Sequence, residues 1–157
     1  MIPPPADPLG VLASLCCLLL HTVAGIASLL VLIPGSPVIH DIFQRAHFLS
    51  SHRFEWTLMW ATWTMASLSL FGFFWAIGSR LENRPERLMR AIAIVMLIAL
   101  GVDVSAQVMY ATLAPALATD LVQAAAPDRI LAAARLVWCE RLPGLLSGGV
   151  ANSLYSR

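Results

Sequence analysis

One carboxylate stands in the middle of a long apolar segment, and it is the residue of this sequence best placed to do chemistry. Asp103 is the only charged residue between positions 91 and 115. Gln107 and Tyr110 follow it at i+4 and i+7, so a helix through this segment carries one polar stripe. Where such a helix crosses a membrane, an ionisable side chain is costly, faces protein and is expected to have a partner.

Two further polar residues are expected at the same depth as Asp103. His21 lies at the midpoint of an apolar segment at 9–33, and Ser67 at the midpoint of another at 56–78. We expect His21 to pair with Asp103 across two helices, either as a neutral pair or as an ion pair. The predicted intramembrane polar cluster comprises His21, Ser67, Asp103, Gln107 and Tyr110.

Several chemistries could use such a cluster. Ser67, His21 and Asp103 have the residue types of a nucleophilic triad, but no nucleophile elbow surrounds Ser67. Proton relay between His21 and Asp103 is a second reading. His21 as a haem or chlorin ligand is a third, although no second axial histidine lies in these segments. We favour a structural polar clasp, assign no catalytic residue, and leave both the cofactor and the question of an enzyme open.

The composition indicates a membrane protein. Apolar residues make up 59% of the 157 residues, and charged residues only 12%, about half of what soluble domains carry. The segments 9–33, 56–78 and 91–115 are each long enough to cross the roughly 30 Å hydrocarbon core. The start "MIPPPADP" has no basic residue, which disfavours a signal peptide. The net charge of +1 implies no nucleic-acid partner.

A short amphipathic helix on the membrane surface is expected after the first span. Ser36 and Pro37 predict its N-cap and first turn. Its apolar side would hold Ile39, Ile42, Phe43, Ala46 and Leu49, and its polar side His40, Gln44, Arg45 and His47. His40 and His47 are about 10 Å apart along a helix, too far to share an ion, so we predict no metal site. Trp56 and Trp75 would mark the two interfaces of the second span.

The C-terminal segment at about 130–156 is expected to form a fourth helix, kinked at Pro143. Its charged residues Arg135, Glu140 and Arg141 would then have to face protein, because charges facing lipid are costly. Gly144 and Gly148 form a GxxxG pattern that lets helices approach closely. This contact could lie inside the chain or between chains.

The whole chain is therefore predicted to be one all-α integral membrane domain, 1–157: a helical bundle of three transmembrane helices, an interfacial helix and a kinked fourth helix. Arg80, Arg84, Arg87 and Arg90 cluster after the second span, which predicts a cytoplasmic link and a cytoplasmic N-terminus. The expected role is a non-catalytic multi-pass subunit or scaffold in a bacterial inner membrane, bound to other membrane subunits or to itself. The alternative is a membrane enzyme or carrier with a polar pocket around His21 and Asp103.

Overall fold

The computed structural model describes residues 8–80 and 85–155, and these residues form helices joined by short connections. The longer elements are α1 (Pro8–Gly35), α2 (Ile42–Ser51), α3 (Arg53–Gly78), α4 (Glu86–Gln123) and α5 (Arg129–Pro143). A short 3-10 turn, Ala126–Asp128, precedes α5. A π-helical stretch, Gly144–Ala151, and α6 (Asn152–Tyr155) follow it. The helices α1, α3 and α4 are long and apolar enough to cross a membrane, as the sequence predicted.

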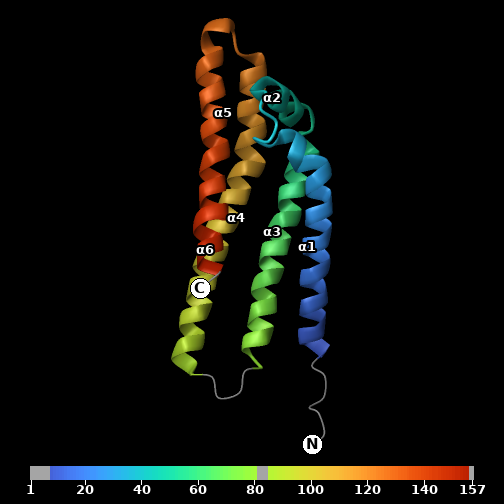
Figure 1. Ribbon diagram of the computed structural model, residues 1–157, viewed down its shortest axis with the longest axis vertical. Coiled ribbons are helices and arrows are strands. Elements are labelled where there is room, and N and C mark those ends of the chain that lie inside the picture. The colour runs from blue at the N-terminus through green and yellow to red at the C-terminus, as the bar shows by residue number, and fades with distance from the viewer. Residues whose placement is uncertain (1–7, 81–84, 156–157) are drawn as a thin grey trace, which may run out of the picture.

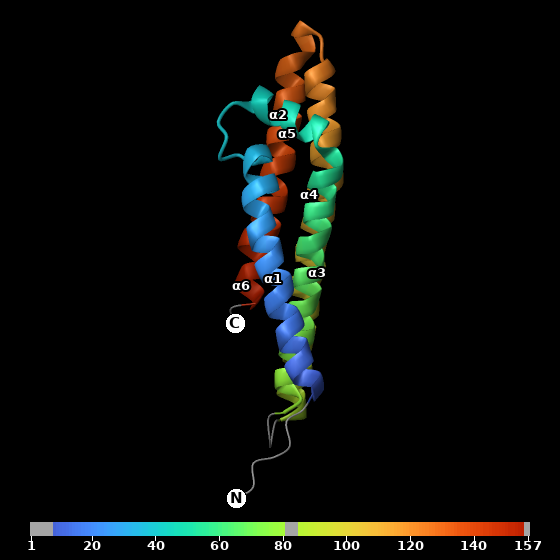
Figure 2. The same cartoon turned by 90° about the vertical axis from the view of Figure 1, so that its right-hand side faces the viewer.

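The long helices stand side by side in an open row rather than in a closed bundle. α1 packs along α3, α3 packs along α4, and α4 packs along α5 and the segments that follow it. Figures 1 and 2 show that α6 ends short of the lower end of α4, so the first turns of α4 lie beyond the end of the C-terminal segment. α1 makes few direct contacts with the C-terminal segment, and both line one open cleft.

α4 is longer than the predicted 91–115 span. It runs for 38 residues through Pro115, which corresponds to about 57 Å. The Trp56 indole donates a hydrogen bond to the Tyr110 carbonyl oxygen at 3.0 Å, which places the first turn of α3 level with Tyr110. α4 continues past that level because Ala118 and Leu121 are buried against α2 and α5. The hairpin of α4 and α5 consequently extends beyond α1 and α3 (Figure 1).

The prediction for the cap of the short helix was wrong. Asp41, not Ser36, caps α2, because its carboxylate accepts hydrogen bonds from the backbone of Phe43 and Gln44. Ser36 instead closes the turn after α1, where its hydroxyl donates to the Ile33 carbonyl oxygen at 2.9 Å. α1 continues to Gly35, so the connection that separates it from α2 begins only after that residue.

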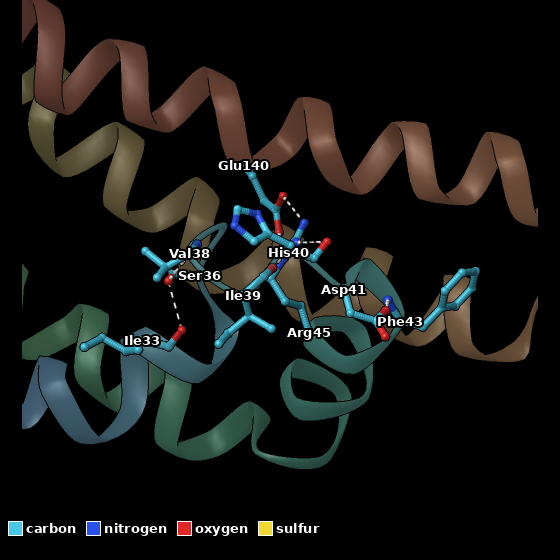
Figure 3. Close-up of polar contacts among 9 residues, drawn as sticks. All are labelled: Ile33, Ser36, Val38, Ile39, His40, Asp41, Phe43, Arg45 and Glu140. Atoms are coloured by element: carbon cyan, nitrogen blue, oxygen red, sulfur yellow. Dashed lines mark hydrogen bonds and ion pairs between the residues drawn. The ribbon is translucent and has the colours of Figure 1, made fainter.

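The predicted faces of α2 were also partly wrong. Arg45 was placed on the polar side but is buried. Arg45 and Glu140 of α5 form a bidentate ion pair, with Nε–Oε1 and Nη2–Oε2 distances of 3.1 and 2.9 Å (Figure 3). The partner from α5 is what allows a guanidinium to lie on the buried side of α2.

The C-terminal segment stays helical through Pro143. The chain changes from α-helix to π-helix after this proline, which has no N–H to give to an α-helical hydrogen bond. Glu140 faces protein as predicted, but Arg135 and Arg141 are exposed, which corrects that part of the prediction. A Cβ atom added to Gly144 or Gly148 would meet nothing within 4 Å, so the GxxxG pattern does not pack within the described part of the chain.

The inner face of α3 holds three of its four tryptophans, Trp56, Trp60 and Trp63. Trp56 is fully buried and packs edge-to-face on Tyr110, with ring centroids 5.4 Å apart. Trp63 donates a hydrogen bond to the Ser28 hydroxyl of α1 at 2.7 Å. Trp75 is 63% exposed. Trp56 is therefore a core residue rather than the lipid-facing anchor that the sequence suggested, and Trp75 alone has the exposure of an anchor.

Candidate functional site in the middle of the helix row

Asp103 is held by hydrogen-bond donors from three segments of the chain. The Ser67 hydroxyl of α3 donates to Oδ2 at 2.7 Å, and the Gln107 amide of α4 donates to the same oxygen at 2.9 Å. The Ser147 hydroxyl of the π-helical stretch donates to Oδ1. Every one of these contacts uses the Asp103 side chain as an acceptor.

A second layer of contacts fixes the orientation of Gln107. The Thr64 hydroxyl donates to Gln107 Oε1 at 2.8 Å, so the amide nitrogen must point the other way. That nitrogen donates to Asp103 and also to the Ser67 hydroxyl, at 3.0 Å. Ser67, Asp103 and Gln107 are all buried. The network ties α3, α4 and the C-terminal segment together at one depth, and we call Ser67, Asp103, Gln107 and Ser147 the polar clasp.

The polar clasp forms part of the wall of an open cleft of about 450 Å³. α1 contributes His21, Ser28 and Leu32 to the cleft, and α3 contributes Trp60, Trp63, Ser67 and Leu70. Asp103 and Gln107 come from α4, and Ser147 and Asn152 from the C-terminal segment. The cleft therefore lies where the row of helices is open, and each of the segments that line it contributes at least one polar side chain.

His21 lines the cleft but does not form the predicted pair with Asp103. Its Nδ1 lies 2.9 Å from the Cys17 carbonyl oxygen of its own helix. A carbonyl oxygen only accepts hydrogen bonds, so Nδ1 carries the proton and Nε2 of the neutral ring is an acceptor. The ring packs edge-on to Trp63, with centroids 6.3 Å apart. Hydroxyl and amide donors thus take the place expected for the histidine.

Tyr110 lies apart from the polar clasp. Its ring packs between Trp56 and Trp60, with a centroid distance of 5.1 Å to Trp60. Its hydroxyl and the Trp60 indole nitrogen are buried, and neither has a hydrogen-bond partner among the described residues. The i+7 position brings Tyr110 to the same side of α4 as Asp103 but two turns further along. Tyr110 thus belongs to the aromatic core and not to the site.

The hydrogen bonds do not assemble a nucleophilic triad. Ser67 donates its proton directly to Asp103, and His21 donates its Nδ1 proton to backbone. A triad needs the histidine between the hydroxyl and the carboxylate. No group of three or more potential metal ligands occurs in residues 8–80 and 85–155. The polar clasp can join α3, α4 and the C-terminal segment, and it can present polar groups to a ligand or helix that lies in the cleft.

Two members of this network were not predicted from the sequence. Ser147 lies in the C-terminal segment, whose rotation no periodic pattern fixed, and Thr64 is one of many hydroxyl residues on α3. Ser147 precedes Gly148, and the open space at Gly148 shows that the clasp and the GxxxG pattern occupy different sides of this segment. The sequence offered one signal for Ser147, namely that the C-terminal segment could place it at the same depth in the membrane as Asp103.

Comparison with known proteins gave no match to a family model, a curated protein or a solved structure. The function of the chain therefore has to be inferred from the geometry of the cleft and of the polar clasp.

Proposed function

We propose that this chain is a non-catalytic subunit of a membrane complex, and that a transmembrane helix of another chain lies in the cleft. The observation that carries the proposal is the open row of helices with a polar cleft at its middle. Polar groups facing lipid are costly, and intramembrane polar residues therefore face protein or a water-filled cavity. A helix seated between α1 and the C-terminal segment would cover them.

The chemistry of the cleft favours this role over catalysis. The clasp hydroxyls of Ser67 and Ser147 both donate to the one carboxylate of Asp103, and no histidine lies between a hydroxyl and that carboxylate as a nucleophilic triad requires. His21 Nε2, Ser28 and Asn152 remain as groups that could accept or donate hydrogen bonds at the surface of the cleft. Serine, asparagine and histidine side chains of this kind hydrogen-bond across helices in membranes.

A second candidate is a carrier or enzyme that binds a small molecule in the same place. The cleft volume of about 450 Å³ lies in the range of small-molecule sites, which is roughly 300–1,000 Å³. Trp60 and Trp63 would supply its aromatic walls. A bound pigment or quinone would then be recovered with the purified protein.

The proposed setting is a bacterial inner membrane with a cytoplasmic N-terminus. The support is the group of arginines near the end of α3 and the start of α4, two of which, Arg87 and Arg90, lie in the first turns of α4. Basic residues close to the ends of spans count toward the positive-inside rule. Arg84 lies outside the described residues.

Purification in a mild detergent separates the two candidates. A subunit is expected at a mass that includes a second polypeptide, or a second copy of this chain, in fixed stoichiometry. Native mass spectrometry gives that mass, and an absorbance spectrum of the same sample reports a pigment or quinone. A monomer with a stoichiometric small molecule would contradict the subunit proposal and favour the carrier or enzyme.

A further inference from the structure

A second pocket lies between the loop after α1 and helix α5, and it carries more basic than acidic groups. Its volume is about 660 Å³, and its charged or ionisable lining residues are His40, Arg45, Glu140 and Arg141. Figure 3 shows the His40 ring on the side of the loop that faces α5. The pocket is distinct from the mid-membrane cleft, because the two share no lining residue.

The only acid in the lining of this pocket is already neutralised. Arg45 binds both carboxylate oxygens of Glu140, and its Nη1 donates to the Ile39 carbonyl oxygen at 2.5 Å. Arg141 is exposed, and its side chain has no ion pair or hydrogen bond within the described part of the chain. The pocket therefore carries one uncompensated positive charge, at Arg141. The buried ion pair between Arg45 and Glu140 joins α2 to α5 and so holds the walls of the pocket in place.

The pocket lies near one end of the membrane spans. Cys139, which precedes Glu140, belongs to the same buried cluster as Trp56 and Tyr110. Trp56 lies in the first turn of α3, which begins at Arg53. Lipid headgroups are expected at this level, because the apolar part of α3 runs from here toward Gly78.

An apolar surface leads away from the basic groups along the C-terminal segment. The rest of the pocket is lined by Pro37, Val137, Gly144 and Leu145. Gly144 and Gly148 have open space at their Cβ positions, so no side chain obstructs the surface there. Leu145 is 66% exposed beside them. A flexible hydrocarbon chain can lie against such a surface, with its polar end at Arg141.

We propose that this pocket binds an anionic phospholipid. Arg141 makes charge-assisted hydrogen bonds to the phosphate, a geometry that suits the guanidinium group. His40 donates a further hydrogen bond from the opposite wall, and an acyl chain lies along Gly144 and Gly148. Basic pockets between membrane helices recognise anionic headgroups in this way. The preference for an anionic lipid follows from the unpaired charge of Arg141.

The test compares lipid binding by Arg141→Gln with that by Arg135→Gln. Both arginines are exposed on α5, but only Arg141 lines the pocket. The full chain is purified, delipidated and titrated with phosphatidylglycerol or phosphatidylcholine, and bound lipid is counted by native mass spectrometry. Arg141→Gln should lower the affinity for phosphatidylglycerol about five- to tenfold, the worth of one basic residue near a headgroup.

Arg135→Gln should leave the phosphatidylglycerol affinity within about twofold of the unmodified chain, and His40→Gln should lower it by less than Arg141→Gln does. Equal losses in the two arginine variants would overturn the proposal, because they would show only general charge attraction. Full competition by soluble glycerophosphate would overturn the assignment of a lipid. Circular dichroism checks that each variant is folded before binding is measured.

Discussion

Asp103 is stabilised in this structure by neutral donors and not by a cation. Two hydroxyls and one amide from three segments converge on its carboxylate. Hydrogen bonds to charged groups contribute about 1.5–3 kcal/mol in soluble proteins, but interhelical bonds measured in a membrane protein average only about 0.6 kcal/mol. We therefore expect the clasp as a whole to contribute a few kcal/mol, enough to fix how α3, α4 and the C-terminal segment rotate relative to one another.

Coupling energies distinguish the observed partners of Asp103 from the predicted one. In a double-mutant cycle, Ser67→Ala and Asp103→Asn should be non-additive by more than about 0.5 kcal/mol, because the two side chains share a hydrogen bond. His21→Gln and Asp103→Asn should add within about 0.5 kcal/mol, because no hydrogen bond joins them. The free energy of unfolding in detergent micelles is the quantity to measure. Coupling confined to the histidine cycle would show that the clasp geometry is wrong.

At the residue scale, the sequence was informative about depth and uninformative about rotation. Asp103 could be singled out because a charge is rare in a long apolar segment, and Gln107 because i+4 positions share a helix face. The side chains that face Asp103 depend on how each helix is rotated about its own axis. The hydrophobic pattern of the sequence did not determine those rotations. The direct pair with His21 was therefore wrong, and Ser147 was missed.

At the scale of elements, the end of α1 is a closely packed junction. A Cβ atom built on Gly35 would lie 2.6 Å from Trp56 Cζ3 and 2.9 Å from a methyl carbon of Leu49. Trp56 and Leu49 are both fully buried and belong to the same hydrophobic cluster. The absence of a side chain at Gly35 thus allows α1 to end directly against α2 and α3.

Gly35→Ala should therefore destabilise the chain by about 1–3 kcal/mol, the usual cost of overpacking a well-filled core. Gly25→Ala on the same helix is the matched control, since its Cβ would meet nothing within 4 Å. That substitution should be neutral or stabilising by up to about 1 kcal/mol, because alanine is the better helix former. Unfolding in detergent compares the two variants. Equal stabilities for both would contradict the packing at Gly35.

Helix type was easier to predict than helix ends. Long apolar segments predicted α1, α3 and α4, because length and hydropathy alone decide whether a helix can span a membrane. The extension of α4 to Gln123 depends on tertiary packing against α2 and α5, which the sequence does not display. Arg45 was assigned to the polar side of α2 for the same reason, because its partner Glu140 lies 95 positions further along the chain.

At the scale of the whole molecule, the two ends of the helix row differ in structure. One end carries α2 and the hairpin of α4 and α5, and the other carries the end of α3 and the start of α4 (Figure 1). The basic residues Arg87 and Arg90 at the start of α4 predict that this second end faces the cytoplasm.

Single cysteines at the two ends test this orientation. In a chain with Cys16 replaced by alanine, Ser79→Cys should resist a membrane-impermeant maleimide added to intact cells, and Asp128→Cys should react. Both positions are exposed, so access to the reagent and not burial decides the result. The reverse labelling pattern would invert the topology.

The most direct test of the proposed partner helix is photo-crosslinking from within the cleft in native membranes. A photoreactive residue at Leu70, which lines the cleft, should give an adduct of one discrete mass containing a second polypeptide. The same residue at Leu68, which is 46% exposed on α3 but outside the cleft, should give lipid adducts only. Lipid adducts from both positions, with no polypeptide crosslinked at Leu70, would contradict the proposal that a helix of another chain fills the cleft.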